Sequence, residues 1–457
     1  MKYHIYGAIH KHAKKILKRD NSLPATVKIV DFPPTILDEL EQNSMNKEIE
    51  INGEIYSGIK KSDIYPVENL VANEEFKNCP MSFSMKGHTL KKLKKFEMAE
   101  GLWKQFLESS YIPIGYKYSG LHYGGYIAEK ASWCLPSWIW TNAAVVRYHC
   151  LVGEMDKAKK LGDIILLNQH ISGGWIVRID YMDDGAHPIL APNDSCYIAH
   201  NCCLKLFQST HDEKYLNAAE KTAAWIMETA RKDGMVLFGY DIKMKYWITK
   251  KNIVDIGFTA GLFAELFSLT GKKVYRDFLE GFVNKYIDIF YIKGKKCFAT
   301  CIDENDRIHG GAFGRGQGWA LEGLIPTYRV LQSDSIRNII EETVETLLHC
   351  QTSDGGWAYN LLSPLMGIDC KAVPVIAKAL LEWSKVVHST VYDEAISKAM
   401  YWCKKNTVAK GEAAGGIFSY TVEGAIVHNK YTSTALVYAS SYALEVEHER
   451  MREINYS

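Results

Sequence analysis

Two aspartates and an arginine recur along this chain at intervals of about sixty residues. Asp194 lies 61 residues before Asp255, and Asp255 lies 60 residues before Arg315. Two carboxyl groups in one buried site can serve as general acid and base, because burial and a neighbouring charge raise the pKa of one of them. An arginine in the same site can bind the carboxylate of an acidic substrate. We therefore treat Asp194 and Asp255 as candidate catalytic residues and Arg315 as a candidate substrate ligand.

The segment HGGAFGRGQGWALEGL, residues 309–324, contains six glycines. Their spacing matches neither G-x-G-x-x-G nor G-x-x-x-x-G-K-[ST], so the segment is not a recognisable phosphate-binding loop. We expect a turn that places Arg315 and Gln317 in the same site as the aspartates.

Other candidates for substrate binding are side chains suited to sugars, since aromatic faces stack on C–H surfaces and polar groups bond hydroxyls. Besides Arg315, they are Trp138, Trp175, His309, Gln317, Trp319, Trp357 and Asp369. The competing interpretation is that the aspartates only cap their own helices. Against it, no glutamate or glutamine follows three residues after any of them, so no capping box is present.

The elements that must position these residues form a repeat. Apolar helical runs begin near Trp138, Asp194, Asp255, Arg315, Asp369 and Tyr431, at intervals of 56, 61, 60, 54 and 62 residues. The run at 254–271 is apolar around nearly its whole circumference, which predicts an enclosed inner helix. Amphipathic runs such as 210–232 and 333–350 lie between them and predict outer helices with one buried face.

Closure of these repeats into a ring requires one more outer helix, which residues 90–110 can supply. Glycine pairs near the inner helix starts permit the tight turns that bring the chain back inward. We therefore predict an all-α fold, an (α/α)6 barrel spanning residues 86–457, with an open solenoid as the alternative. Inner helices that run in parallel would gather the candidate residues at one mouth of the ring.

Residues 1–85 do not show the helical repeat of the rest of the chain. They contain prolines, short runs of alternating polar and apolar residues, and an Asn52-Gly53 turn. We predict an N-terminal extension with one β-hairpin at that turn.

Composition excludes several classes of partner. The net charge of +1 argues against a nucleic-acid-binding protein with a broadly basic surface. We expect no membrane-spanning segment, because no stretch of 18 apolar residues occurs. We also expect no signal peptide, because the N-terminus MKYHIYGAIHKHAKK lacks an uninterrupted apolar run. The eleven scattered cysteines are typical of free thiols in the cytoplasm. Cys297 and Cys301 lack a second metal-type pair, so no metal site is expected.

The stretch FGRGQGWALEGL, residues 313–324, resembles the R-G-[QN]-x-W segment of unsaturated glucuronyl and rhamnogalacturonyl hydrolases. This resemblance implies an (α/α)6-barrel glycosidase with two aspartates at successive inner helix starts, here Asp194 and Asp255. His309 corresponds to a histidine shortly before the family's R-G-Q run. The segment around the first aspartate differs: the family usually has H-D-x-G-F, whereas Asn193-Asp194-Ser195-Cys196-Tyr197 stands here. A D-x-G-F string occurs instead at the second aspartate, as Asp255-Ile256-Gly257-Phe258.

The resemblance also implies a mechanism that needs no cofactor. Asp255 would protonate C4 of a 4,5-unsaturated uronic acid and then activate water for attack at C5. Asp194 would be the neighbouring charge that raises the pKa of Asp255. The expected partner is an oligosaccharide or polysaccharide substrate.

Two alternatives remain open from the sequence. The stretch SGGWIVRIDY, residues 172–181, is similar to the G-G-W segment of glucuronyl epimerases, which would make the protein a uronyl C5-epimerase or a related sugar isomerase. The third interpretation is a carbohydrate-binding scaffold without activity, whose aspartates only cap helices.

Overall fold

A computed structural model of the chain describes eleven segments. They are residues 48–57, 96–114, 118–127, 132–134, 139–178, 188–241, 246–249, 251–362, 368–369, 371–421 and 432–456. Within these segments, no helix combines the length and apolar character needed to cross a membrane.

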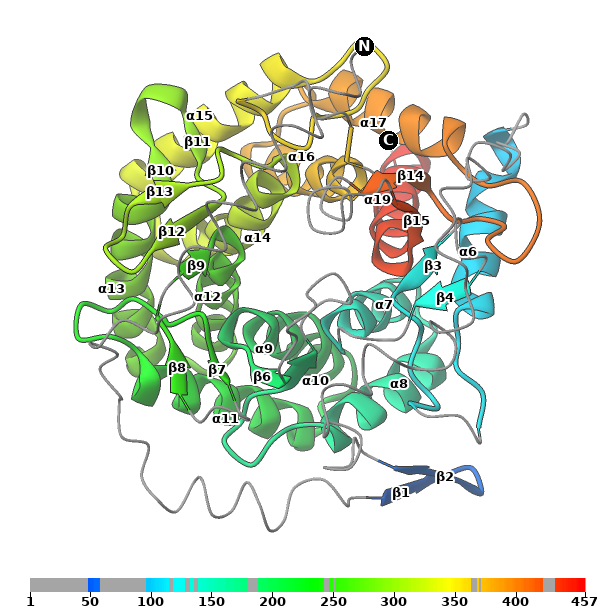
Figure 1. Cartoon of the computed structure of the whole chain (residues 1–457), viewed down its shortest axis with the longest axis horizontal. Helices are drawn as coiled ribbons and strands as arrows, with labels where there is room; N and C mark the ends of the chain where they lie inside the picture. Colours follow the sequence, from blue (N-terminus) through cyan, green and yellow to red (C-terminus); the bar gives the residue numbers. More distant parts are fainter. Residues whose placement is uncertain are drawn as a thin grey trace, which may run out of the picture.

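Six inner helical segments surround the middle of the molecule in the described part of the chain (Figure 1). They are α7 (Ile139–Leu151), α9 (Pro192–Ile198) with its continuation through η4 (Ala199–Leu204) and α10 (Lys205–Thr210), α12 (Phe258–Thr270), α14 (Gly314–Leu331), α16 (Ala372–Val387) and α19 (Val437–Tyr456). Each packs against the next, and α19 packs against α7. The ring is therefore closed, which excludes the open solenoid.

Outer helices pack around this ring. They are α6 (Ala99–Ser109), α8 (Met155–Leu167), α11 (Glu213–Thr229), α13 (Lys273–Phe290), α15 (Asp334–Cys350) and α17 (Asp393–Lys405). Helix α6 lies beside α19, so the chain before the first inner helix supplies the outer partner of the last one (Figure 1). The predicted (α/α)6 barrel is confirmed.

Hydrophobic patterning explains the two layers. In α12, buried residues fall on all sides of the helix, including Phe258, Leu262, Phe263 and Leu266. In α15, the buried side chains at Ile336, Ile340, Val344 and Leu347 form one stripe. A helix that is apolar all round must be enclosed, whereas a striped helix can leave its other face in water.

Three glycine turns fix the distance between layers. Gly173, Gly355 and Gly415 have φ angles of 106°, 94° and 87°. A Cβ atom at these positions would lie 2.4, 2.1 and 1.7 Å from the backbone oxygens of Lys221, Lys398 and Leu102. Each of these oxygens belongs to an outer helix. Glycine is needed at these turns both for the positive φ and for the close backbone approach.

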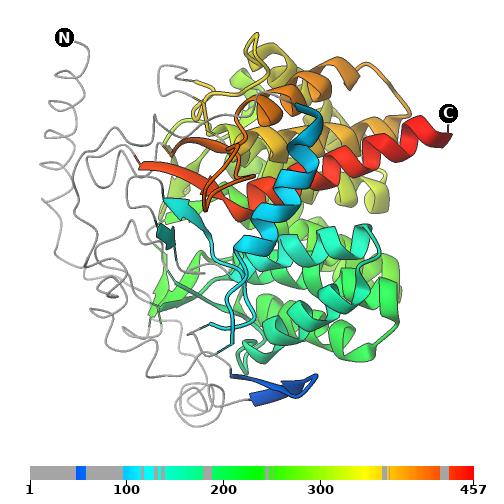
Figure 2. The same ribbon diagram turned by 90° about the vertical axis from the view of Figure 1, so that its right-hand side faces the viewer.

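Short strands, which the helical repeat did not predict, lie at one end of the barrel (Figure 2). One sheet has the order β5 (Ile176–Arg178), β6 (Pro188–Leu190), β7 (Gly239–Asp241) and β8 (Tyr246–Ile248). A second joins β14 (Phe418–Thr421), β15 (Thr432–Leu436), β3 (Gly125–Ile127) and β4 (Ser132–Cys134). A third has the order β13 (Ile308–His309), β12 (Cys301–Asp303) and β9 (Lys251–Ile253), and β10 (Tyr291–Ile292) pairs with β11 (Cys297–Phe298).

Three of these strands lead directly into inner helical segments. Strand β6 ends at Leu190 before α9, β9 ends at Ile253 before the 3₁₀ turn η5 (Val254–Gly257), and β15 ends at Leu436 before α19. The starts of these inner segments therefore share the strand-bearing end of the ring, which we call the mouth.

The predicted hairpin is present as β1 (Glu48–Ile51) and β2 (Glu54–Ser57). Asn52 and Gly53 have φ angles of 55° and 80°, as a two-residue hairpin turn with two positive φ angles requires. The hairpin lies against α8, where Lys160 Nζ is 3.2 Å from Glu54 Oε2. The boundary expected at residue 85 lies outside the described segments.

Candidate active site

Asp194 and Asp255 occupy equivalent places at the mouth. Asp194 lies in the first turn of α9, and Asp255 lies in η5, which leads into α12. The residues at the N-cap positions are Ala191 and Ile253, so neither aspartate occupies the place of a helix cap. Both residues are 7% exposed. The interpretation of these two aspartates as simple caps is therefore wrong.

The two carboxyl groups interact electrostatically. Burial, and then the negative charge of Asp255, raise the pKa of Asp194 well above its usual value. Both causes act in the same direction, so they favour the protonated form of Asp194. The expectation that the pKa of Asp255 is raised stays a prediction.

Asp255 accepts a hydrogen bond from a neighbouring amide. Asn193 Nδ2 donates a hydrogen bond to Asp255 Oδ2 at 3.0 Å. A donor stabilises the ionised form of the carboxyl group that accepts from it. Negative charge is therefore favoured on Asp255, and the shared proton is favoured on Asp194.

Arg315 is fixed at the start of α14. Its guanidinium carbon lies 4.9 Å from the centre of the Phe313 ring and 5.0 Å from that of Trp319. Its Nη1 donates to Asp369 Oδ2 at 3.0 Å. The side chain remains 12% exposed. Arg315 is thus a pre-oriented cation that solvent, and an anionic ligand, can reach.

A cluster of aromatic side chains from four inner helical segments lies beside Arg315. Trp140 lies 5.9 Å from Trp319 and 5.4 Å from Tyr197 between ring centres, and Phe258 lies 5.7 Å from Trp319 and 4.8 Å from Tyr197. Trp140, Phe258 and Trp319 each keep between 4% and 8% exposure. The predicted residue Trp319 thus belongs to the cluster. Trp140 and Phe258 were missed, although Trp140 stands only two positions after the candidate Trp138.

Two predicted tryptophans are corrected by the structure. Trp175 and Trp357 are both fully buried. Their Nε1 atoms donate to the backbone oxygens of Ile165 and Leu347, each at 2.8 Å. These oxygens lie in the last turns of α8 and α15. Each indole therefore holds the turn that follows an outer helix against that helix and is not available to a substrate. The G-G-W segment that suggested an epimerase is the turn that follows α8.

Gln317 and Asp369 are also corrected. Gln317 is fully buried, and its amide exchanges hydrogen bonds with the backbone of Phe298 at 2.7 and 2.9 Å. Asp369 is fully buried, binds Arg315, and accepts a hydrogen bond from Lys371 N at 3.0 Å. Gln317 therefore joins α14 to β11, and Asp369 positions Arg315 instead of meeting a substrate itself.

The remaining candidates stay predictions. His309 lies on the edge strand β13 with its side chain 56% exposed, and its Nε2 is 3.2 Å from Asp303 Oδ2. Its sheet includes β9, the strand that leads to Asp255. Trp138 and Tyr431 lie outside the residues that the structure describes.

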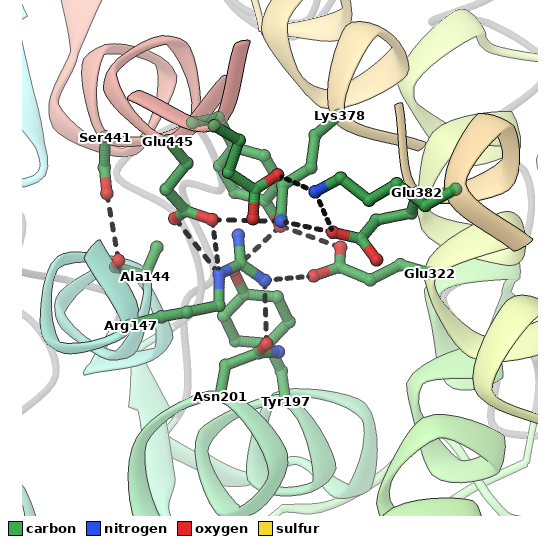
Figure 3. A network of polar contacts seen from close by, with 12 residues as sticks. Ala144, Arg147, Tyr197, Asn201, Glu322, Lys378, Glu382, Ser441 and Glu445 are labelled. Carbon is green, nitrogen blue, oxygen red and sulfur yellow. Dashed lines mark hydrogen bonds and ion pairs between the residues drawn. The ribbon is translucent and has the colours of Figure 1, made fainter. Parts of the chain in front are cut away.

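A second group of buried and partly buried charges, missed from the sequence, is drawn in Figure 3. We call it the axial network: Arg147, Asn201, Glu322, Lys378, Glu382, Tyr442 and Glu445. Three of its members, Arg147, Glu322 and Glu445, stand eight residues after the first residue of α7, α14 and α19, respectively. At about 1.5 Å per residue, this places them roughly 12 Å below the mouth.

Arg147 is the centre of the axial network. Its Nε donates to Glu445 Oε1 at 3.0 Å, and its Nη1 donates to Asn201 Oδ1 at 2.7 Å and to Glu322 (Figure 3). Lys378 Nζ lies 3.2 Å from Glu445 Oε2. Opposite charges from four inner helices are thus paired with one another.

A comparison with family models assigns the chain. The model described as Glycosyl Hydrolase Family 88 matches residues 180–444, more than half of the 457 residues. The chain belongs to Glycosyl Hydrolase Family 88. The matched region contains Asp194, Asp255, Arg315 and Trp319, and the protein is accordingly a glycoside hydrolase.

Solved structures agree with the family 88 fold. An unsaturated glucuronyl hydrolase specific for heparin is similar with a TM-score of 0.61 at 16% identity, covering 79% of this chain and 97% of its own. The enzyme of the same name from Bacillus sp. GL1 has a TM-score of 0.58 at 17% identity, covering 77% and 96%. A possible GH105 member from Klebsiella pneumoniae subsp. pneumoniae MGH 78578 has a TM-score of 0.58 at 14% identity, covering 82% and 98%. A search among curated proteins finds no match.

Proposed function

We propose that this family 88 enzyme removes a 4,5-unsaturated uronic acid from the end of an oligosaccharide. The observation that carries the proposal is the pair of buried carboxyl groups, Asp194 and Asp255, at the starts of successive inner helical segments. Hydration of a carbon–carbon double bond needs a proton donor near neutral pH, and a raised carboxyl pKa provides one. Similar folds among named unsaturated glucuronyl hydrolases support the substrate class.

Arg315 is proposed to bind the uronate carboxylate. A guanidinium presents N–H donors in a plane that matches a carboxylate. Asp369 and the rings of Phe313 and Trp319 hold that plane in place before the substrate arrives. Less ordering is then required on binding, which favours affinity.

The reaction is an acid-catalysed hydration. A carboxyl group of the pair gives its proton to C4, and the oxygen of a water molecule bonds to C5 as its proton passes to a carboxylate. The resulting hemiketal opens to a ketone at C5, and the hemiacetal left at C1 releases the remaining sugar as an alcohol. The double bond is consumed, and one water molecule is used for each bond cleaved.

The two aspartates are proposed to divide this work unequally. Asp194 holds the proton in the free enzyme, because Asp255 carries the charge that Asn193 stabilises. The family resemblance assigns proton donation to Asp255. Comparing kcat of Asp194→Asn with kcat of Asp255→Asn separates these assignments. The variant that lacks the proton donor should have the lower kcat.

The test is hydrolysis of an unsaturated uronyl disaccharide, followed by the loss of the ultraviolet absorbance of its double bond. We expect a steady loss with the wild-type enzyme and the appearance of one free sugar per double bond consumed. A saturated glucuronide with the same second sugar is the matched control and should remain intact.

Cleavage of the saturated glucuronide at a comparable rate would contradict the proposal. It would show displacement at the anomeric carbon, which is the ordinary reaction of a two-carboxylate glycosidase. Sugar release without loss of the double bond would contradict it in the same way.

A further inference from the structure

Asn193 precedes one aspartate in the sequence and contacts the other in space. It lies in the first turn of α9, next to Asp194, and reaches across to Asp255 in η5. Only 5% of its surface is exposed. A buried amide in contact with one member of the carboxyl pair can influence both.

The orientation of the amide follows from its partner. An ionised carboxylate only accepts hydrogen bonds, so the NH₂ group of Asn193 must face Asp255 Oδ2. The amide oxygen then points away from that carboxylate. Asn193 Oδ1 is buried and has no hydrogen-bond partner among the residues that the structure describes.

Two other buried asparagines, Asn142 and Asn252, have a hydrogen-bond partner for both the amide oxygen and the amide nitrogen. Asn142 accepts from His122 N at 2.7 Å and donates to His122 O at 3.3 Å. Asn252 accepts from Ile253 N at 2.9 Å and donates to Val236 O at 2.7 Å. A buried acceptor without a donor is unfavourable, and such groups mark places where a ligand or water completes the bonding.

We propose that Asn193 has two roles at this site: its amide nitrogen positions the Asp255 carboxylate, and its amide oxygen accepts a hydrogen bond from a hydroxyl group of the bound sugar. This proposal rests on the proposed function for the identity of that sugar. An unsaturated uronyl ring carries free hydroxyl groups at C2 and C3, so one of these two is the donor. Asn193 is then a determinant of specificity.

The first experiment compares pH–rate profiles of wild type, Asn193→Leu and Asn193→His. Leucine keeps the shape and removes both hydrogen bonds, whereas an imidazole N–H can still donate to Asp255. We expect Asn193→Leu to lower kcat/KM about 100-fold and to move the profile about one unit toward higher pH, because the carboxylate loses a donor. Asn193→His should restore the position of the profile.

Other charged groups facing Asp255 set the background of this shift. They are Asp194, and the buried Tyr286, whose pKa is raised by its burial and by the charge of Asp255. Asn142→Leu is the matched control, since it removes a buried amide elsewhere in the ring. Its profile should stay where the wild-type profile lies. Equal profiles for wild type and Asn193→Leu would overturn the positioning role.

The second experiment identifies the hydroxyl group. Unsaturated uronyl substrates lacking the C2 or the C3 hydroxyl are compared with the parent in wild type and Asn193→Leu. We expect one deoxy substrate to lose about 10-fold in kcat/KM with wild type and nothing further with the variant. Independent, multiplying losses for both deoxy substrates would show that the amide oxygen binds only water, and would overturn the specificity role.

A third measurement keeps this inference separate from the proposed function. Carbon NMR of ¹³C-labelled aspartate follows the titration of the carboxyl pair without any turnover. We expect the transition of the pair to move about one pH unit upward in Asn193→Leu, whatever substrate the enzyme accepts. An unmoved transition would refute the positioning role even in an active enzyme. A moved transition in an enzyme inactive on unsaturated uronides would refute only the proposed function.

Discussion

The carboxyl pair at the mouth and the axial network below it both bury charge, but they are built in opposite ways. At the mouth, two groups of the same sign interact, and an amide donates to one of them, Asp255. In the axial network, Arg147 and Lys378 lie among Glu322, Glu382 and Glu445, so that each charge has partners of the opposite sign. Like charges held together perturb protonation and supply chemistry, whereas opposite charges held together join elements.

Shifts in pKa show the same difference. Burial alone would lower the pKa of Arg147, but the surrounding charges, with Glu445 first, raise it above its usual value. Burial opposes ionisation of Glu382 as well, yet Lys378 and other cations lower its pKa to about 2. For Asp194 both burial and the neighbouring charge act in the same direction. Glu445 is an exception in the network, because burial raises its pKa although Arg147 and Lys378 act to lower it. The charged forms of Arg147 and Glu382 are thus favoured by their partners, whereas the charged form of Asp194 is disfavoured.

Tyr197 connects the two regions. Its ring belongs to the aromatic cluster beside Trp140 and Phe258, and its hydroxyl lies 2.8 Å from that of Tyr442. Tyr442 in turn donates to Glu322 at 2.8 Å. The cluster that forms the base of the site is therefore held from below by the axial network.

The largest expected effect is on the carboxyl pair. Asp194→Asn and Asp255→Asn should each lower kcat by about 10²–10⁴-fold, with the larger loss in the variant that lacks the proton donor, because either change removes an acid or a base from the reaction. The thermal unfolding temperature should not fall, since one of two repelling carboxyl groups is gone. Steady-state kinetics and calorimetry on the same samples check both statements. Near-normal rates in both variants would show that the chemistry lies elsewhere.

Arg147→Met should act on stability instead of chemistry. It leaves Glu322 and Glu445 buried without their arginine, at a cost of about 3–5 kcal/mol in the free energy of unfolding. Urea denaturation measures this, and kcat per folded molecule should stay within a few-fold of wild type. The double variant Arg147→Met with Glu445→Gln should recover part of the loss. Full stability in Arg147→Met would remove the contrast between the two regions.

Arg315→Ala should weaken substrate binding. Loss of a charge-assisted contact to the substrate is expected to raise KM roughly 10–100-fold, with a smaller change in kcat. Asp369→Asn should raise KM less, because Arg315 remains but is held less firmly. A methyl ester of the uronate is the control, since wild type and Arg315→Ala should handle it alike. Unequal rates on the ester would argue against carboxylate binding.

The raised pKa of Asp194 predicts a pH-dependent stability. A carboxyl group whose pKa is higher in the folded state than in the unfolded state loses stability as pH rises above the unfolded value of about 4. The loss proceeds at up to about 1.4 kcal/mol per pH unit until the folded-state pKa is passed. Thermal unfolding from pH 4 upward should therefore show Asp194→Asn gaining on wild type. Parallel curves would mean that the pair is not repulsive.

The smallest effects separate the two kinds of tryptophan. Trp175→Phe removes the hydrogen bond to Ile165 and should cost about 1 kcal/mol of stability while leaving KM unchanged. Trp319→Phe changes the cluster beside Arg315 and should alter KM by a few-fold at similar stability. Isothermal titration with a sugar ligand and urea denaturation distinguish them. A KM effect in Trp175→Phe would mean that it reaches the site.

Much of the architecture follows from the sequence alone. Helices that are apolar all round must be enclosed, and stripes of apolar residues must face them, so the six-fold alternation predicted both layers and the helix supplied by residues 90–110. The Asn52-Gly53 hairpin followed from turn chemistry. The position of Asp194 and Asp255 at equivalent helix starts followed from the repeat length, because equal repeats bring equal positions together.

Only the tertiary structure decided where the side chains at those positions point and what they bond. Trp175, Trp319 and Trp357 each follow a glycine, yet Trp175 and Trp357 bond to the ends of outer helices and Trp319 joins the aromatic cluster. Arg147 and its partners are separated by up to 298 residues, so no local pattern could pair them. Repeat spacing fixes the level of a residue in the ring, whereas its direction depends on the neighbours that pack against it. The bond from Asn193 to Asp255, which sets the charge of the pair, exists only because two inner helical segments meet.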